Sequence, residues 1–192
     1  MSDRKKEILS LAIEIIARQG YASLTMRALA KASGMKLGAL QYHFATREAL
    51  LTALTQYIGQ IYQESLDALE RRRSLSIRDV VEWYLQDSGG DQLHSDWLWP
   101  QLWAMGRVEP QMRALLADVS QHVVALFEYY LEQAGSTNAR VEAIAILSLA
   151  EGSTLFVGDG SPWQQDAYAL TNSILNAIEA RYGGANESDR VA

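Results

Sequence analysis

Apolar residues recur at helical spacing along almost the whole chain of 192 residues, and this pattern constrains the fold more than any other feature. In the first segment, Ile8, Leu11, Ala12, Ile15 and Ile16 follow the i, i+3, i+4, i+7, i+8 spacing of one helix face. We find no segment with the alternating pattern of a strand and no internal repeat. The sequence therefore predicts an all-α protein.

Glycines, prolines and capping residues divide this pattern into nine helices. The first predicted helix ends before Gly20. The other eight cover 26–32, 36–43, 47–70, 76 to the Gly89-Gly90 pair, 92–106, 110–133, 139–157 and 162–182. Thr25, Thr46 and Ser76 are predicted caps, and Ser161 is expected to cap a last helix that Pro162 begins. Pro100 is expected to kink or restart its helix. The tail 183–192 is predicted to be disordered.

The composition leaves little material for an enzyme or a metal site. The chain has no cysteine, and its histidines, His43, His94 and His122, lie far apart. We find no acid–histidine–serine arrangement and no metal-ligand spacing, so the sequence predicts no catalytic residue, no metal and no cofactor. No apolar run approaches the length of a membrane span, and the start MSDRKKE does not resemble a signal peptide. We expect a soluble, cytoplasmic protein without a membrane partner.

The charges are distributed unevenly along the chain. Residues 1–50 carry a net charge of +4, although the whole chain carries −6. All four lysines lie at or before position 36. Solvated helix faces explain these charges by themselves, but a basic end on an acidic body also suits contact with a polyanion.

Two short helices and the helix before them have the features of a helix-turn-helix unit. Gly34 permits the tight turn between 26–32 and 36–43, and Ala30 is small where the helices cross. The second short helix of such a unit enters the DNA major groove. There Gln41 can pair with a base edge, and Tyr42 and His43 can donate to phosphates. Alternatively, Tyr42 packs on the first helix and His43 is simply exposed.

The run LTMRALAKASGMKLGALQYHFATREAL, from Leu24 to Leu50, resembles the DNA-binding signature of TetR-family transcriptional regulators. Lys36 stands where that family usually has a capping Ser or Thr, and Leu37 and Gln41 also depart from the common pattern. The resemblance implies a nine-helix architecture, with a three-helix helix-turn-helix domain at 1–46 and a ligand-binding and dimerisation domain at 47–182. The expected DNA-binding residues are Thr25, Arg27, Lys36, Leu37, Gly38, Ala39, Gln41, Tyr42, His43 and Arg47.

The resemblance further implies a homodimer joined through the last two helices, with an effector pocket among the central helices. The function expected from it is a repressor that a small hydrophobic or cationic effector releases from a palindromic operator on double-stranded DNA. The runner-up is a helical small-molecule-binding protein without a DNA function, which would not explain the charge asymmetry or the run from 24 to 50.

Aromatic residues gather in the central part of the sequence, where four of the five tryptophans lie between positions 83 and 103. Each of them has a simple interpretation as core, but aromatic walls with a few polar groups are also typical of a small-molecule pocket. An acid beside tryptophan faces can hold an organic cation. The predicted ligand-binding residues are Trp83, Trp97, Trp99, Trp103, Phe127, Tyr130 and Glu151. Glu151 faces either this pocket or the dimer seam.

The segment 139–157 is apolar nearly all round, and the last helix carries two apolar stripes. One subunit has too little surface to cover both helices, so two copies are expected to form a four-helix bundle about a twofold axis. The predicted interface residues are Leu147, Leu155, Leu170, Ile174 and Ile178.

Overall fold

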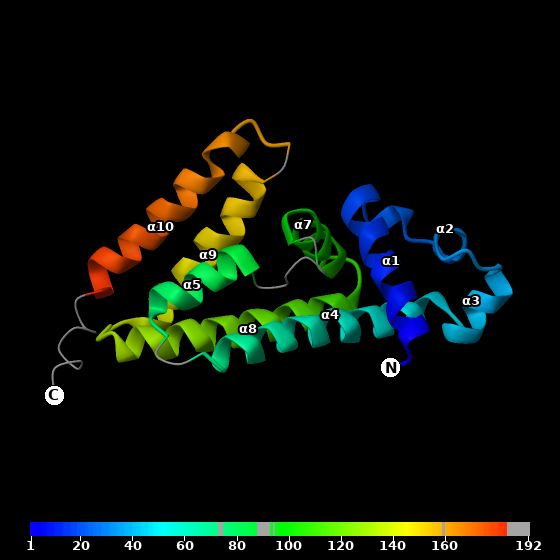
Figure 1. Ribbon diagram of the computed structural model, residues 1–192, viewed down its shortest axis with the longest axis horizontal. Helices are drawn as coiled ribbons and strands as arrows, with labels where there is room; N and C mark the ends of the chain where they lie inside the picture. The colour runs from blue at the N-terminus through cyan, green and yellow to red at the C-terminus, as the bar shows by residue number, and fades with distance from the viewer. Residues whose placement is uncertain (73–74, 88–92, 94, 159, 184–192) are drawn as a thin grey trace. The chain divides into compact units, whose positions relative to one another are not determined.

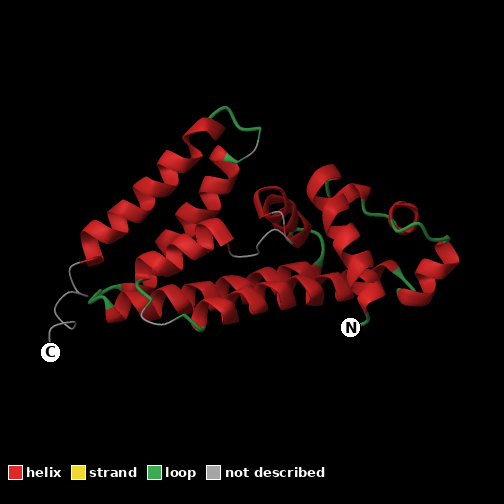
Figure 2. Ribbon diagram, in the orientation of Figure 1, coloured by secondary structure: helices red, strands yellow, loops and turns green. Residues whose placement is uncertain are grey.

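The computed structural model describes residues 1–72, 75–87, 93, 95–158 and 160–183, and within these ranges every regular element is a helix (Figure 2). The described part of the chain forms nine α-helices, which carry the same labels in Figure 1. They are α1 (Asp3–Gln19), α2 (Met26–Ala32), α3 (Leu37–His43), α4 (Arg47–Glu70), α5 (Ile77–Asp87), α7 (Ser95–Gly106), α8 (Pro110–Gln133), α9 (Ala139–Val157) and α10 (Ala167–Tyr182). Short 3₁₀ turns, η1 (Tyr21–Ser23) and η2 (Gln164–Asp166), precede α2 and α10. The all-α prediction is confirmed.

Three helices begin at the capping residues that the sequence predicted. Thr25 Oγ1 accepts a hydrogen bond from the Ala28 backbone N–H at 3.0 Å, and Thr46 Oγ1 caps α4 in the same way at 3.1 Å. Before α5, the Ser76 N–H donates to the Asp79 carboxylate while the Asp79 N–H donates to Ser76 Oγ. These three predicted caps are confirmed.

One of two predicted alternatives is excluded at Pro100, and the start of the last helix differs from the prediction. Pro100 lies inside α7, which continues to Gly106, so the proline does not restart the helix. The last helix begins at Ala167 rather than Pro162, because Ser161 Oγ accepts from the Trp163 N–H at 3.1 Å and so forms a turn instead of a helix cap. The Gly89-Gly90 pair and residues 184–192 lie outside the described part of the chain.

No helix among the described residues is both long enough and apolar enough to cross a membrane.

The chain forms two compact units, which we call the first and the second unit. The first unit comprises residues 1–64 and 89–117, and the second comprises 65–88 and 118–192. In the first unit, α7 and parts of α4 and α8 pack together with the helix-turn-helix, and the expected domain boundary at residue 46 stays a prediction. Helices α4 and α8 contribute residues to both units.

One buried cluster holds the first unit together. Helix α1 packs against α7, η1 and α2, and α2 packs against α3. The cluster draws residues from all of these helices and from α4, among them Ile8, Leu9, Ile13, Ile16, Leu29, Leu40, Leu50, Leu54, Ile58, Leu98, Leu102 and Met105. The helix-turn-helix therefore shares its core with α7 and the start of α8.

In the second unit, α10 packs against α5 and α9. Glu142 at the start of α9 accepts hydrogen bonds from Ser136, Arg181 and Tyr182. The Ser136 hydrogen bond, followed by that of Tyr182, lowers the pKa of Glu142. This carboxylate therefore joins the end of α10 to the turn before α9.

Candidate nucleic-acid interface

The turn between α2 and α3 has the tight geometry that the sequence predicted. Gly34 has φ +64°, a backbone conformation that side chains disfavour. The buried Ser33 hydroxyl donates to the Leu29 carbonyl oxygen at 2.7 Å, and the Met35 N–H donates to the Ala30 carbonyl oxygen at 2.8 Å. Ala30 is buried where α2 meets the rest of the unit. These contacts fix α3 at a sharp angle to α2.

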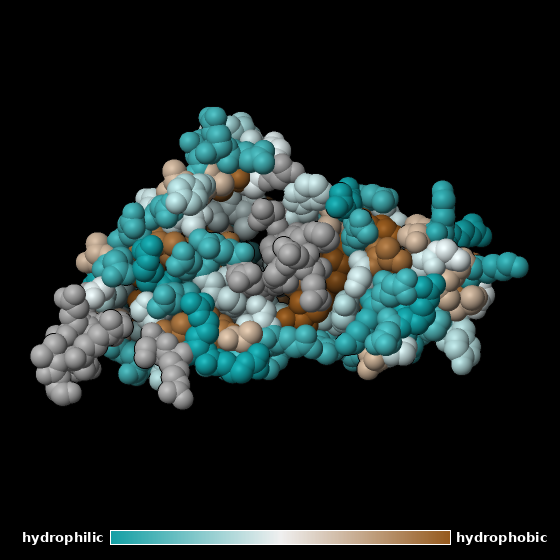
Figure 3. Space-filling model, viewed as in Figure 1, coloured by the Kyte–Doolittle hydropathy of each residue, from teal (hydrophilic) through white to brown (hydrophobic). Residues whose placement is uncertain are grey.

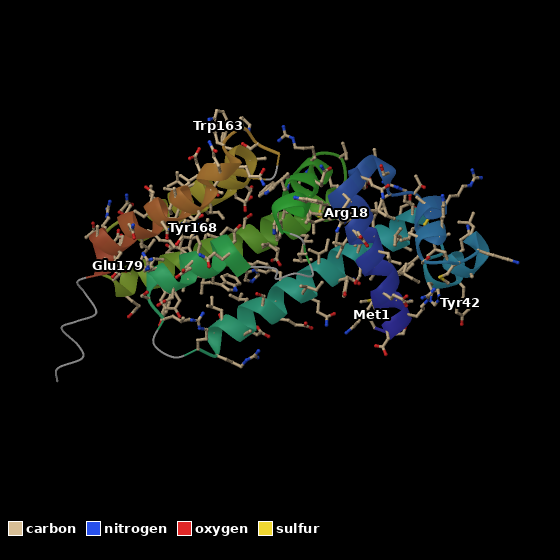
Figure 4. All side chains as sticks on the ribbon, turned by 45° about the horizontal axis from the view of Figure 1, so that its top comes forward. Met1, Arg18, Tyr42, Trp163, Tyr168 and Glu179 are labelled. Carbon is tan, nitrogen blue, oxygen red and sulfur yellow. The ribbon has the colours of Figure 1, made fainter. Side chains whose placement is uncertain are left out.

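Helix α3 buries one side and exposes the other. Leu40 and, just after the helix, Phe44 are buried in the core of the first unit. Tyr42 is 89% exposed and projects away from the helix bundle (Figure 4). Its ring therefore does not pack on α1, and the alternative that the sequence left open is excluded. Lys36, Gly38, Ala39 and Gln41 are exposed beside it.

No contact within the described part of the chain requires a glycine at position 38. Gly38 lies inside α3 with ordinary helical backbone, and a Cβ added there would meet no atom within 4 Å. Glycine in a helix interior costs about 1 kcal/mol relative to alanine. The open surface at Gly38 therefore suits the close approach of an external partner.

The other expected DNA contacts occupy three kinds of position. Thr25 and Arg27 at the start of α2 are exposed, and Thr25 also caps that helix. Leu37 and His43 are half-buried, and the His43 ring lies edge-on to Tyr42 with 5.6 Å between ring centroids. Arg47 is also half-buried, and its guanidinium is bonded to Glu109 and Tyr21.

The surface around α2 and α3 is largely hydrophilic. Hydrophilic side chains protrude from this region at the right of the view in Figure 3. Arg27, Lys31 and Lys36 are all exposed there. The Lys5 ammonium group instead makes a cation–π contact with a core side chain, since its Nζ lies 5.7 Å from the centroid of the Phe44 ring. The exposed cations give α2 and α3 a positively charged surface.

Some of the predicted ligand-binding residues meet in the second unit. The Tyr84 hydroxyl on α5 donates to the Glu151 carboxylate on α9, and the Tyr84 ring lies edge-on to Phe127 at 5.7 Å. Trp83 lies beside Tyr84 at 6.3 Å, and its Nε1 donates to Ser65 Oγ at 3.2 Å. Phe127 and Trp83 are buried, whereas Glu151 is half-buried. Tyr130 is half-buried on α8, and burial raises its pKa.

The other predicted ligand-binding residues lie on α7 in the first unit. Trp99 is half-buried and packs edge-on against Tyr62 at 6.4 Å. Trp97 and Trp103 are exposed, and the Arg18 guanidinium lies 5.4 Å from the Trp97 ring centroid. The predicted ligand-binding tryptophans are therefore divided between the two units.

A surface cavity of about 170 Å³ in the second unit includes Trp83 but is otherwise polar. It is lined by Arg72, Asp79, Glu82, Trp83 and Gln86. This volume lies below the range of about 300–1,000 Å³ that is typical of pockets for drug-sized ligands.

The predicted dimer residues differ in their exposure within one protomer. Leu155 on α9 is 67% exposed, whereas Leu147, Leu170 and Ile174 are half-buried. Ile178 on α10 is only 7% exposed, so it belongs to the core of the second unit. Sequence reasoning missed further exposed apolar side chains on α9 and after it, namely Val141, Ile144, Leu149, Phe156 and Trp163.

Sequence reasoning also missed two residues with polar contacts at these sites. Tyr21 and Glu109 each bond Arg47, which lies at least 26 positions away in the sequence. No spacing rule connects residues at such separations. A charged residue directly before a helix, such as Glu109 before Pro110, is a weak signal that the sequence offers.

Comparison with known proteins gives a family match at the helix-turn-helix. Residues 8–54 match the model of bacterial regulatory proteins of the tetR family. The uncharacterized HTH-type transcriptional regulator YerO of Bacillus subtilis (strain 168) is 37% identical over 60 residues. That match covers 31% of this chain and only 21% of the length of YerO.

Solved structures match nearly the whole chain. A protein described as a TetR-family transcriptional regulator from Rhodococcus sp. has a TM-score of 0.74 at 23% identity, and the match covers 94% of this chain and 100% of that one. A transcriptional regulator from Saccharomonospora viridis, solved in complex with choline, has a TM-score of 0.71 at 20% identity over 93% and 97% of the two chains. These likenesses show that the nine-helix architecture is that of TetR-type regulators.

Proposed function

We propose that the chain is a sequence-specific DNA-binding transcriptional regulator of the TetR family, because residues 8–54 match the tetR family model and the fold matches solved TetR-type structures. The finer proposal is a repressor that a small effector releases from a palindromic operator. Proteins of this family are regulators rather than enzymes. The observation that carries the proposal is the outer face of α3, where polar side chains surround an open backbone at Gly38.

The polar residues on this face have two roles, and the small and apolar residues have a third. Lys36 and Tyr42 hold phosphates, because one carries a charge and the other an exposed hydroxyl. Thr25, Arg27 and His43 support the same backbone contacts from the rim. Gln41 reads a base edge in the major groove, where its amide pairs bidentately with adenine. Gly38 and Ala39 leave room for the DNA, and Leu37 can touch a thymine methyl group.

The protein acts as a homodimer through α9 and α10 in this proposal. The apolar side chains exposed on α9 have no cover within one protomer, and they include Val141, Ile144, Leu149, Leu155 and Phe156. Gly152 on the same helix has no atom within 4 Å of an added Cβ. A second copy of α9 that crosses near Gly152 would use both features. The twofold axis then presents two α3 helices to major grooves about 34 Å apart.

The effector that we propose is a small organic cation bound in the second unit. Glu151 supplies a carboxylate, Tyr84 orients it, and Trp83 and Phe127 supply aromatic surface beside Tyr84. Aromatic faces with an acid attract quaternary ammonium groups. The choline complex of the Saccharomonospora viridis protein supports this ligand class.

Release from DNA follows if the effector prefers an arrangement in which the two α3 helices no longer match the grooves. Helix α4 is a suitable transmitter, because it is a continuous helix of 24 residues that begins beside the helix-turn-helix and enters the second unit. Its length is about 36 Å at 1.5 Å per residue. A coupling free energy of about 1–3 kcal/mol lowers operator affinity roughly 5- to 150-fold.

Selection from a randomised pool of DNA duplexes tests the proposal directly. We expect purified protein to enrich a palindromic sequence at low salt and to lose it steeply as salt rises. Gln41→Ala is expected to relax preference at one base-pair position by about 1–3 kcal/mol, whereas Lys36→Ala weakens all sequences alike. If no duplex is enriched while choline still binds, the protein is a small-molecule-binding protein without a DNA function.

A further inference from the structure

Three side chains in the first unit form a closed polar triangle. Arg47 Nη1 donates to Glu109 Oε1 at 3.0 Å, and Nη2 of the same guanidinium donates to the Tyr21 hydroxyl. That hydroxyl in turn donates to Glu109 Oε1. The Arg47 guanidinium also lies over the Tyr21 ring, 5.1 Å from its centroid. We call Tyr21, Arg47 and Glu109 the clasp.

The clasp connects three segments that are distant in sequence. Tyr21 lies in η1, between the first two helices of the helix-turn-helix unit, and Arg47 is the first residue of α4. Glu109 precedes α8 and accepts, through its backbone carbonyl, the first hydrogen bond of that helix from Arg113. In Figure 1 the turn between α7 and α8 reaches α1 and the start of α4. The clasp therefore ties the helix-turn-helix to the beginning of α8.

The surroundings of the clasp favour the contact. The Glu109 side chain is 19% exposed and that of Arg47 is 41% exposed, so a departure of Arg47 would leave a partly shielded carboxylate without its cation. The hydrogen bond from Tyr21, followed by the contacts from Arg47, lowers the pKa of Glu109. Its carboxylate is therefore charged at neutral pH, which strengthens the pairing with the guanidinium.

We propose that Arg47 is a positioning residue of the helix-turn-helix and does not contact DNA. Its two Nη groups are directed at Glu109 and Tyr21, so the guanidinium fixes the start of α4 against α8 instead of holding a phosphate. The orientation of α3 then depends on the α7–α8 turn through Glu109. This inference rests on the proposed DNA-binding function, and it replaces the phosphate role that the sequence suggested for Arg47.

Tyr21→Phe provides the sharpest variant, because it removes one hydroxyl without changing any charge. We expect this variant to bind a fluorescein-labelled duplex of mixed sequence roughly three- to tenfold more weakly than the wild type, with an unchanged salt dependence. Tyr129→Phe is the matched control, since Tyr129 is exposed in the second unit, and it should bind like the wild type. Wild-type affinity for Tyr21→Phe would overturn the proposal.

A double-mutant cycle of Arg47→Gln and Glu109→Gln supplies a second measurement, which remains decisive if Tyr21→Phe folds poorly. We expect the double variant to bind the duplex no more weakly than either single variant, because both remove the same contact. Arg47→Gln should keep the slope of log affinity against log salt, whereas the phosphate-binding control Lys36→Gln lowers it by about one.

The possible outcomes separate the inference from the function on which it rests. A slope that falls by about one for Arg47→Gln, together with tighter binding by Glu109→Gln, would show that Arg47 holds a phosphate and would overturn the clasp. If the wild-type protein binds no duplex even at low salt, the proposed function fails, and the positioning role falls with it.

Discussion

Arg4 Nη2 donates a hydrogen bond of 2.9 Å to the backbone carbonyl oxygen of Ser33, 29 residues further along the chain. Ser33 is the C-cap residue of α2, where the turn to α3 begins, so the first turn of α1 supports the geometry that orients α3. Arg4 is otherwise bonded only locally, to Glu7 at 2.6 Å, among the contacts described. The basic start of the chain therefore has a structural role in addition to its charge.

Replacing Arg4 by alanine is expected to lower the free energy of unfolding by about 1 kcal/mol, because the Ser33 carbonyl loses its partner. Urea unfolding followed by circular dichroism measures this change. Lys6→Ala removes the same charge from the same helix and should stay within about 0.5 kcal/mol of the wild type. Equal losses in both variants would mean that net charge, and not the Ser33 contact, is responsible.

Gly38→Ala should have opposite effects on stability and on DNA binding. Alanine favours the helix by about 1 kcal/mol and meets no atom of the chain, so thermal stability should rise. The added methyl group lies on the face proposed to approach DNA, so affinity for a selected duplex should fall. Thermal melting and fluorescence anisotropy together test this prediction. A variant that is more stable and binds as tightly as the wild type would place the DNA away from Gly38.

Leu155 and Ile178 should respond differently to aspartate, although the sequence assigned both to the dimer seam. Leu155→Asp places a charge on an exposed surface, so we expect folded monomers in sedimentation. Ile178→Asp places a charge in the core and should cost about 3 kcal/mol or more in the free energy of unfolding. Thr137→Asp, on an exposed turn, is the control. A dimeric Leu155→Asp variant would exclude α9 from the interface.

Glu151 should determine the charge preference of the effector site. We expect wild-type protein to bind choline in preference to its neutral tert-butyl analogue, as followed by tryptophan fluorescence, because the carboxylate beside Tyr84 attracts the cation. Glu151→Gln should lose this preference, whereas Glu132→Gln, on the exposed part of α8, should keep it. Equal binding of both compounds by the wild type would contradict a cation site at Glu151.

Acidification should weaken the second unit through Glu142. Because the pKa of Glu142 is lower in the folded than in the unfolded state, its ionised form stabilises the fold above the unfolded value and loses this effect as pH falls through the folded value. The difference in unfolding free energy between wild type and Glu142→Gln should therefore be constant above about pH 6 and shrink below about pH 4.5. Denaturant unfolding at several pH values measures it. A difference that persists unchanged in acid would show that charge on Glu142 contributes nothing.

The sequence by itself determined the features that depend on a few neighbouring residues. Helical periodicity, the caps at Thr25, Thr46 and Ser76, and the turn at Gly34 all follow from contacts within about one helical turn. The helix-turn-helix could be predicted for the same reason. The start of the last helix was misplaced, because Ser161 can form either a helix cap or a turn, and the two differ only in local hydrogen bonding.

Only the tertiary structure decided which distant residues meet. Arg47 pairs with a carboxylate 62 positions away, and Tyr84 bonds Glu151 across 67 positions. An apolar stripe shows that a helix buries one face, but not which helix covers it. Ile178 and Leu155 therefore look alike in sequence. Ile178 is nevertheless buried on α10, which packs against α5 and α9, whereas Leu155 on α9 is exposed. Such contacts depend on how helices pack in three dimensions, and periodicity along one helix carries no information about its neighbours.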